Sequence, residues 1–310
     1  MSIDRITNNS QTQLMIAQLN TANANLAQSE QQVSSGNVSN TYAGYGDQVQ
    51  ALEAANSGAA RANAYKAAAQ AGLNQANLQD TQLTELSSLA NQLRQDITTA
   101  SANNDGSTLM TQVQGVFDQA VQVLNSTDAN GNYLFGGDKT NTAPVNITSL
   151  SQLASAPSAA SVFVNGTVKS SVTVAEGQTV TVGVLASDVG TQLMQTIKDL
   201  VDYTNSNGAL TSQMTSAQNN FLSGEISSAT TAATTINAAA ASNGDTYQQL
   251  QNAITQQTTM NTLYQGFASN IQNVNMAQAI TTLNQNQSAL QAALQVTSQL
   301  GKLSLLNYFR

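Results

Sequence analysis

Scattered acidic side chains are the main candidates for chemistry in this sequence. The chain of 310 residues contains no His and no Cys, which removes the usual general base and the thiolate nucleophile. Asp199 and Asp202 lie three residues apart in a segment with helical periodicity, so their carboxylates could share a face and bind a cation. Two solvated acids on a helix are the simpler interpretation. We therefore expect no catalytic residue, no cofactor and no metal site.

Two glycine-containing segments partly resemble ligand-binding loops. "DANGNY" (Asp128 to Tyr133) is similar to a calcium loop, but Gly131 comes fourth instead of sixth and no Glu closes the segment. It predicts a tight turn at Asn130-Gly131. "LFGGDKT" lacks the spacing of a phosphate-binding loop and also predicts a turn. Tyr42 and Tyr45 in a glycine-rich loop could stack on a ligand, but we expect them to pack against a neighbouring helix.

The composition excludes several classes of partner. Charged residues make up 8% of the chain and the net charge is −8, so no basic cluster is present to bind nucleic acid. No run approaches the roughly 18 apolar residues that a membrane span needs. The first twenty residues lack the basic and apolar regions of a cleaved signal peptide. Thr246 to Gly301 contain no charged residue, and such a surface favours self-association.

Both ends of the chain carry the 3/4 spacing of a coiled-coil seam. The N-terminal seam is Met15, Leu19, Ala22, Leu26, Ser29 and Val33. The C-terminal seam is predicted to be Met276, Ile280, Leu283, Gln287, Leu290, Leu294 and Thr297. Polar residues within these seams (Ser29, Gln287, Thr297) would specify register at a cost in stability. Isolated helices of this kind bury too little surface to be stable, so each end needs a partner helix or a neighbouring chain.

The intervening sequence predicts long helices around a short β segment. Helical periodicity covers residues 47–100, 109–123 (with Ser107 as a possible cap), 189–205, 210–241 and 246–267. Between Pro144 and Val189, valines alternate on either side of "AEGQ", which predicts a β-hairpin. The fold class is therefore mainly α, with a helical bundle, a terminal coiled coil made from both chain ends and a small β-rich central insert. The expected domains are 1–45 with 268–310, 46–143 with 189–267, and the insert 144–188.

Three segments resemble the bacterial flagellin and hook–filament junction protein family. "NYLFGGDKTNTAP" (Asn132 to Pro144) is similar to the segment that leaves the core helices of the junction proteins. "LAQSEQQVSSGNVSN" (Leu26 to Asn40) is similar to the end of the N-terminal helix of flagellin. "NVNMAQAITTLNQNQSALQAALQVTSQLGKLSLLNYFR" (Asn273 to Arg310) resembles the C-terminal helix of both. The ending "LSLLNYFR" and "NYLFGG" favour the L-type junction protein over flagellin.

The resemblance implies a structural subunit of the bacterial flagellum, an extracellular location, and a homo-oligomer that contacts neighbouring flagellar axial proteins. It also implies export without a cleaved signal peptide, through the flagellar type III export apparatus and with an export chaperone. The expected assembly interface comprises Leu19, Leu26, Val33, Ile280, Leu283, Leu290, Leu294, Leu303, Leu305 and Leu306. Flagellin, the main filament subunit, is the alternative, and a secreted adhesin or binding module that uses the β insert is a lower one. Nothing beyond scattered Asp and Ser side chains points to an enzyme.

Overall fold

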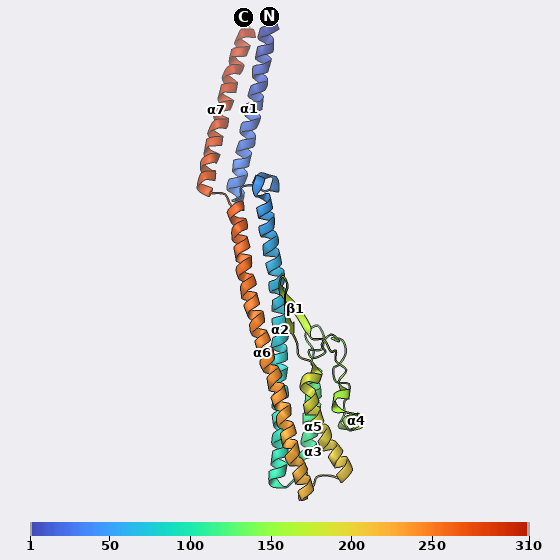
Figure 1. The fold of residues 1–310 in the computed structure, drawn as a ribbon. Coiled ribbons are helices and arrows are strands. Elements are labelled where there is room, and N and C mark those ends of the chain that lie inside the picture. Colours follow the sequence, from blue (N-terminus) through green and yellow to red (C-terminus); the bar gives the residue numbers. More distant parts are fainter. Residues whose placement is uncertain (1, 309–310) are drawn as a thin grey trace. The chain divides into compact units, whose positions relative to one another are not determined.

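The computed structural model describes the backbone of residues 2–308 and the side chains of residues 10–299. The chain forms two compact units, Met1–Arg61 with Met260–Arg310 and Ala62–Thr259, here called the terminal unit and the central unit. In chain order the elements are α1 (Ser2–Ser35), the short helix η1 (Tyr42–Gln48), α2 (Val49–Asn103), α3 (Leu109–Leu124), α4 (Leu150–Ser155), η2 (Ala159–Val162), β1 (Ser170–Ala175), β2 (Gln178–Val182), α5 (Ala186–Asn207), α6 (Ser216–Gln272) and α7 (Met276–Tyr308) (Figure 1). The predicted mainly α fold with a small β insert is confirmed.

The central unit holds the main hydrophobic core. Leucines of α2 pack against the apolar face of α3 and against α5 and α6, with Phe117 and Met194 fully buried. The helices predicted over residues 47–100 and 109–123 correspond to α2 and α3, and their apolar stripes are buried: Leu83, Leu86, Ala90, Leu93 and Ile97 of α2, and Leu109, Val113, Val116, Ala120 and Val123 of α3. Each large side chain of this kind contributes about 1.5–3 kcal/mol when it is fully buried.

Helices α2 and α6 run antiparallel within the central unit and are joined by polar side chains. Ser87 Oγ donates to Asn237 Oδ1 at 2.7 Å, and Asn243 Nδ2 donates to the buried carbonyl of Ala76 at 2.8 Å. The sequence predicted two helices here, 210–241 and 246–267, separated by a break at "SNGD". This prediction is wrong, because α6 continues through these residues as one helix. The bond from Asn243 holds this part of α6 against α2. The helix also begins later than predicted, at Ser216 instead of residue 210. Residues 208–215 are not helical: the Gly106 N–H donates to Thr211 O at 3.0 Å, and the Leu210 side chain is buried.

The cap predicted before α3 also differs. Ser107 does not cap α3, which has Thr108 at its N-cap position without a side-chain cap. The Ser107 hydroxyl and backbone N–H both donate to Asp105 Oδ1 instead, at 2.7 and 2.9 Å. These bonds close the turn that separates α2 from α3.

The predicted β-hairpin is confirmed and rests on helices of the central unit. Strands β1 and β2 are antiparallel, with Val172 opposite Val180, and Gly177 takes a φ of 71° in the turn. The valines of one face pack against α2 and α6, in a cluster with Ala69, Leu73, Ala76, Leu250 and Ala253. Gln257 Nε2 donates to Val174 O at 2.9 Å from α6. The hairpin is therefore fixed to the bundle on one face.

Candidate assembly interface

Helices α1 and α7 pack side by side in the terminal unit (Figure 1). The predicted seam of α1 coincides with its least exposed positions: Met15, Leu19, Ala22, Leu26 and Val33 are half-buried and Ser29 is buried. Three of the proposed interface residues, Leu19, Leu26 and Val33, therefore face inward within a single chain. Their spacing was sufficient to place them, because α1 offers one continuous apolar stripe.

Helix α7 is rotated relative to the predicted seam. Its less exposed stripe comprises Ala279, Leu283, Asn286, Leu290, Ala293 and Thr297. Leu283, Leu290 and Thr297 belong to the predicted seam, but Ile280 is 45% exposed and Leu294 is 53% exposed. The inner stripe thus alternates Leu283 and Leu290 with the smaller Ala279 and Ala293, while Ile280 and Leu294 lie outside it. Met276 and Gln287, which the sequence placed in the same seam, are also exposed.

A polar contact fixes the register of the α1–α7 pair. Asn286 Nδ2 lies 2.5 Å from Ser29 Oγ and 3.2 Å from the Asn25 carbonyl oxygen, and Ser29 is 3% exposed. The sequence predicted a register role for Ser29 and Gln287; Asn286, one residue earlier, makes the contact. This contact favours one register because a slip would remove Asn286 from both of its partners on α1.

Backbone hydrogen bonds join the segment that follows α1 to the segment that precedes α7. The Val38 N–H donates to Gln272 O at 2.7 Å and the Val274 N–H donates to Gly36 O at 2.9 Å, so Asn37 and Asn273 form an antiparallel bridge. Gly36 has a φ of 74°, a conformation that side chains disfavour. The chain thus leaves α1 and enters α7 at the same level.

The rest of the terminal unit has a small core and an open apolar groove. Leu52, Ala55 and Ala268 form the core, with Tyr45 and Ile271 packed against it. Tyr45 therefore packs as predicted, whereas Tyr42 is 54% exposed. The groove, of about 550 Å³, is lined by Ala51, Ala54, Ala55, Arg61, Tyr264, Phe267, Asn270 and Ile271.

A second groove lies between α1 and α7. It has a volume of about 350 Å³ and is lined by Leu14, Ala17, Gln18, Thr21, Ala22, Asn25, Asn286 and Ala289. Three of these eight side chains are alanines, so the groove could accept large side chains from another helix. The terminal unit thus presents both apolar grooves and exposed aliphatic side chains.

Exposed apolar side chains are concentrated in the terminal unit. Among residues with described side chains, eleven large hydrophobics are exposed, and nine of them belong to this unit: Leu14, Ile16, Tyr42, Leu263, Phe267, Met276, Ile280, Leu294 and Val296. Leu303, Leu305 and Leu306 continue α7 as helical backbone, but their side chains lie outside the described residues. This concentration of exposed apolar side chains in one unit makes the terminal unit the candidate surface for a protein–protein contact.

The acidic residues that could have held a cation are engaged elsewhere. Asp202 pairs with Lys198 at 3.1 Å, and Asp199 accepts from Gln195 Nε2 at 2.8 Å. In the described part of the chain no group of three or more His, Cys, Asp or Glu side chains could hold a metal. The Asp128 loop is a turn, as predicted, with Gly131 at a φ of 83°. No helix among the described residues has the length and apolar character that crossing a membrane requires.

Glu225 is a buried acid that the sequence patterns did not indicate. Burial and, secondarily, the nearby Asp199 carboxylate raise the pKa of Glu225 to about 7, and its Oε2 has no hydrogen-bond partner among the described residues. Its burial beside α5 was not predicted, because the Ala- and Ser-rich sequence of α6 around Glu225 does not indicate which face of the helix is buried.

Comparisons with known proteins agree with this architecture. Residues 226–309 match the bacterial flagellin C-terminal helical region. The chain is 35% identical over 72 residues to flagellar hook-associated protein 3 of Escherichia coli (strain K12), covering 22% of this chain and 23% of that protein. It is 46% identical over 43 residues to flagellar hook-associated protein 3 of Salmonella typhimurium, covering 14% of each. The matched segments thus span less than a quarter of the length of these curated relatives.

Two solved structures share the fold. A putative flagellar hook-associated protein from Vibrio parahaemolyticus aligns with a TM-score of 0.59 at 15% identity, over 72% of this chain and 96% of that one. Bacillus cereus FlgL aligns with a TM-score of 0.52 at 13% identity, over 70% of this chain and 98% of that one. The chain is thus similar in its C-terminal part to the C-terminal helical region of bacterial flagellin, similar over shorter segments to flagellar hook-associated protein 3, and shares its fold with these two solved structures.

Proposed function

We propose that this chain is a structural subunit of the bacterial flagellum, located at the junction between hook and filament. The observation that carries the proposal is the concentration of exposed apolar side chains on the terminal unit, nine of eleven among the described residues. Its role is assembly, without catalysis, cofactor or metal. The names of the two curated relatives, both flagellar hook-associated protein 3, support the junction position.

The proposed interface comprises the terminal helices and their neighbours in adjacent subunits. Leu19, Leu26, Val33, Leu283 and Leu290 hold α1 against α7, while Ile280 and Leu294 contact a neighbouring chain; Leu303, Leu305 and Leu306 extend this contact. Segments 1–45 and 268–310 act as the assembly domain, 46–143 with 189–267 as the bundle domain, and 144–188 as an outer insert. The partners are further copies of this chain and other axial proteins of the flagellum.

The proposed route to the extracellular flagellum is the type III export apparatus, with an export chaperone and without a cleaved signal peptide. Flagellin, the main filament subunit, is the alternative, because residues 226–309 match the flagellin C-terminal helical region. A secreted adhesin or binding module that uses the β insert is the lower alternative.

Electron microscopy of cells lacking this chain tests the proposal. A junction subunit predicts hooks without filaments, together with unassembled filament protein in the medium. Cells that keep the junction but lack the repeating tube would identify the chain as flagellin. Normal flagella in these cells would contradict both assignments and favour the binding module.

A further inference from the structure

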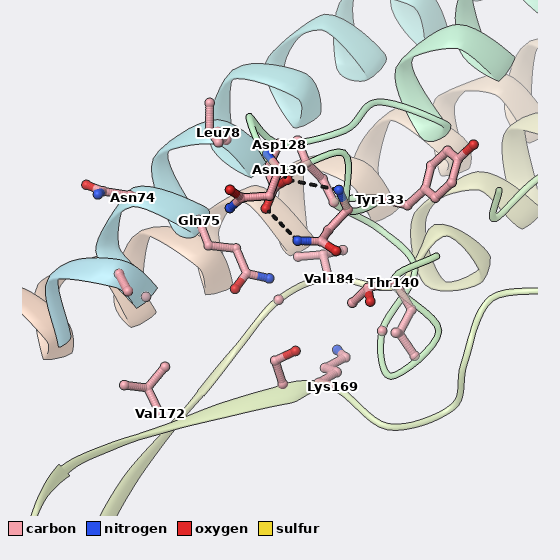
Figure 2. A pocket seen from close by; sticks show the side chains of 18 of the residues that line it. Asn74, Gln75, Leu78, Asp128, Asn130, Tyr133, Thr140, Lys169, Val172 and Val184 are labelled. Atoms are coloured by element: carbon pink, nitrogen blue, oxygen red, sulfur yellow. Dashed lines mark hydrogen bonds between the residues drawn. The ribbon is translucent and has the colours of Figure 1, made fainter. Parts of the chain in front are cut away.

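A cavity in the central unit lies between α2 and the hairpin. It has a volume of about 480 Å³ and is bounded by α2, residues 128–140 and residues 169–185. Figure 2 shows Gln75 and Leu78 extending from α2, Lys169 and Val172 on the hairpin side, and Thr140 on the loop at the side of the cavity. The volume falls in the range of small-molecule sites, roughly 300–1000 Å³.

The cavity wall is held in place by hydrogen bonds within the chain. Asp128 Oδ1 accepts from the backbone N–H groups of Asn130 and Asn132, at 2.8 and 2.9 Å. Gln79, which is fully buried in α2, donates through Nε2 to Leu134 O at 2.6 Å. The Tyr133 N–H donates to Thr140 O at 2.8 Å. A ligand would therefore meet a preformed wall and would not have to order a loop.

The charged groups of the wall already have partners. Lys169 pairs with Asp188 at 3.1 Å. The Asp128 carboxylate is occupied on both oxygens, since Asn132 Nδ2 donates to Oδ2 at 3.2 Å, and the backbone N–H of Asn132 contributes most to holding the pKa of Asp128 below its ordinary value. A charged ligand would thus find its counter-charge already neutralised.

Neutral polar groups of the wall remain available. Gln75, Thr140 and Ser170 are half-buried, line the cavity, and their side chains make no hydrogen bond to any part of the chain that the structure describes. An amide and two hydroxyls can each both donate and accept. Val172 and Val184 supply an apolar surface beside them. Such a wall is complementary to a neutral molecule with hydroxyl groups on its edge and C–H groups on its face. The hydroxyls would bond the polar groups, and the C–H groups would contact the apolar surface.

We propose that this cavity binds a neutral carbohydrate, one sugar unit at a time. The ring hydroxyls exchange hydrogen bonds with Gln75, Thr140 and Ser170, and the C–H face of the ring rests on Val172 and Val184. The inference goes beyond the proposed assembly function, because the cavity belongs to the central unit. It gives the β insert a role of its own.

Saturation-transfer NMR on the full chain tests the proposal, with D-glucose and N-acetyl-D-glucosamine as probes. We expect magnetisation transfer to ring protons at about millimolar affinity, which is usual for a ligand of this size. The double variant Gln75→Ala/Thr140→Val should weaken binding about tenfold or more, since two hydrogen-bonding side chains are lost. Ala71→Leu, which narrows the cavity from an exposed position of a helix, should also reduce it.

Two controls separate binding from folding. Gln70→Ala changes an exposed amide earlier on α2 and should leave binding unchanged, and the circular dichroism of all variants should match that of the parent chain. No transfer to either sugar, or equal transfer in the double variant, would overturn the proposal. Tighter binding of glucose 6-phosphate than of glucose would contradict a preference for neutral ligands. Preferential binding of a peptide with the sequence of residues 279–299 would show that the cavity binds a polypeptide and not a carbohydrate.

Discussion

Amide side chains take the place of ion pairs in this chain. Gln79, Asn243, Gln257 and Asn286 each donate to a carbonyl or hydroxyl of another element. Only two ion pairs occur among the described residues, and both have exposed or half-exposed acids. Surface ion pairs contribute about 0–1 kcal/mol each, whereas a typical hydrogen bond contributes about 1 kcal/mol and its loss leaves a buried group unpaired. The register of the helices is therefore set largely by neutral groups that salt does not screen.

Asn286 gives a direct test of this register function. Replacing it by Leu should strengthen the α1–α7 contact by about 1 kcal/mol, because apolar surface replaces a polar group. It should also permit slipped pairings, because Ser29 keeps its own bond to the Asn25 carbonyl. Because the chain has no Cys, engineered cysteines report register cleanly.

Positions 22 and 293 lie one heptad from Ser29 and Asn286 in the antiparallel pair, so Ala22→Cys/Ala293→Cys should form a disulfide in the parent chain. In the Asn286→Leu background, Ala22→Cys should also form a disulfide when it is combined with Thr297→Cys. Gln287→Leu, at the exposed neighbouring position, is the matched control and should keep a single pairing. A single pairing in Asn286→Leu as well would remove Asn286 from the register mechanism.

Glu225 predicts a specific dependence of stability on pH. Its folded pKa is raised from 4.5 to about 7, so the folded state binds more protons than the unfolded state between these values, and stability falls as pH rises through this window. Glu225→Gln should therefore be more stable than the parent at pH 8, on the order of 1–2 kcal/mol after allowance for partial solvent access. The two proteins should have similar stability below pH 4.5.

Thermal unfolding of both proteins at pH 4.5 and pH 8 provides the measurement. Glu85→Gln makes the same change at an exposed position of α2 and serves as the control. An equal gain in stability for Glu225→Gln at both pH values would mean that repacking, and not proton binding, caused the difference.

At the scale of elements, α7 has two apolar faces with different side-chain sizes. Its inner stripe places alanines and leucines against α1, while Ile280 and Leu294 are 45% and 53% exposed. A helix with two exposed large aliphatic side chains is stabilised when a further helix covers them, at about 1.5–3 kcal/mol for each fully buried side chain. This asymmetry favours a role of the outer face in contacts between subunits.

Leu294→Asp should block self-association while leaving the α1–α7 pair intact. The charge would be buried without a partner at the proposed contact between subunits, but it remains solvated in the single chain. Analytical ultracentrifugation gives the assembly state and circular dichroism gives the helix content. Gln295→Asp, which adds the same charge at the next exposed position, is the control. Polymers of normal size from Leu294→Asp would contradict the outer contact.

Sequence periodicity predicted α1 and most of the bundle but not the rotation of α7. In α1 one apolar stripe has the required spacing, so the seam follows directly. In α7 the same 3/4 spacing fits either Ala279, Asn286 and Ala293 or Ile280, Gln287 and Leu294 beside Leu283 and Leu290. Hydrophobicity favours the second set, whereas close packing and the Asn286–Ser29 bond favour the first. The choice depends on the partner helix, which spacing within one helix does not contain.

The continuity of α6 depended on a partner in the same way. "SNGD" carries a strong local signal for a break, and Asn243 overrides it only because the Ala76 carbonyl lies opposite. The hairpin could be predicted because its turn and its alternation are local. The cavity beside it was not predicted, since it requires three segments that lie far apart in the sequence.

At the scale of the molecule, the two units differ in how their apolar residues are used. The central unit buries large side chains such as Phe117, Phe135 and Met194. In the terminal unit the buried apolar side chains among the described residues are Leu52, Ala55, Ala268 and Ala279, and large aliphatic side chains are exposed. The central unit therefore has the interactions needed to fold by itself, whereas the terminal unit is, in the assembly that we propose, completed by neighbouring copies.

Deleting Leu283 to Arg310 tests this division of roles. The truncated chain should remain soluble and folded, because the core of residues 62–259 is untouched, but α1 loses its partner and a helix of this kind is marginal alone. We expect a loss of helix content, an unchanged thermal transition of the central unit and no polymerisation at concentrations at which the full chain assembles. Electron microscopy and sedimentation velocity measure assembly, and limited proteolysis should cleave within residues 10–35 before the central unit. Tubes of normal diameter from the truncated chain would show that assembly depends on surfaces of the bundle and not on the α1–α7 pair.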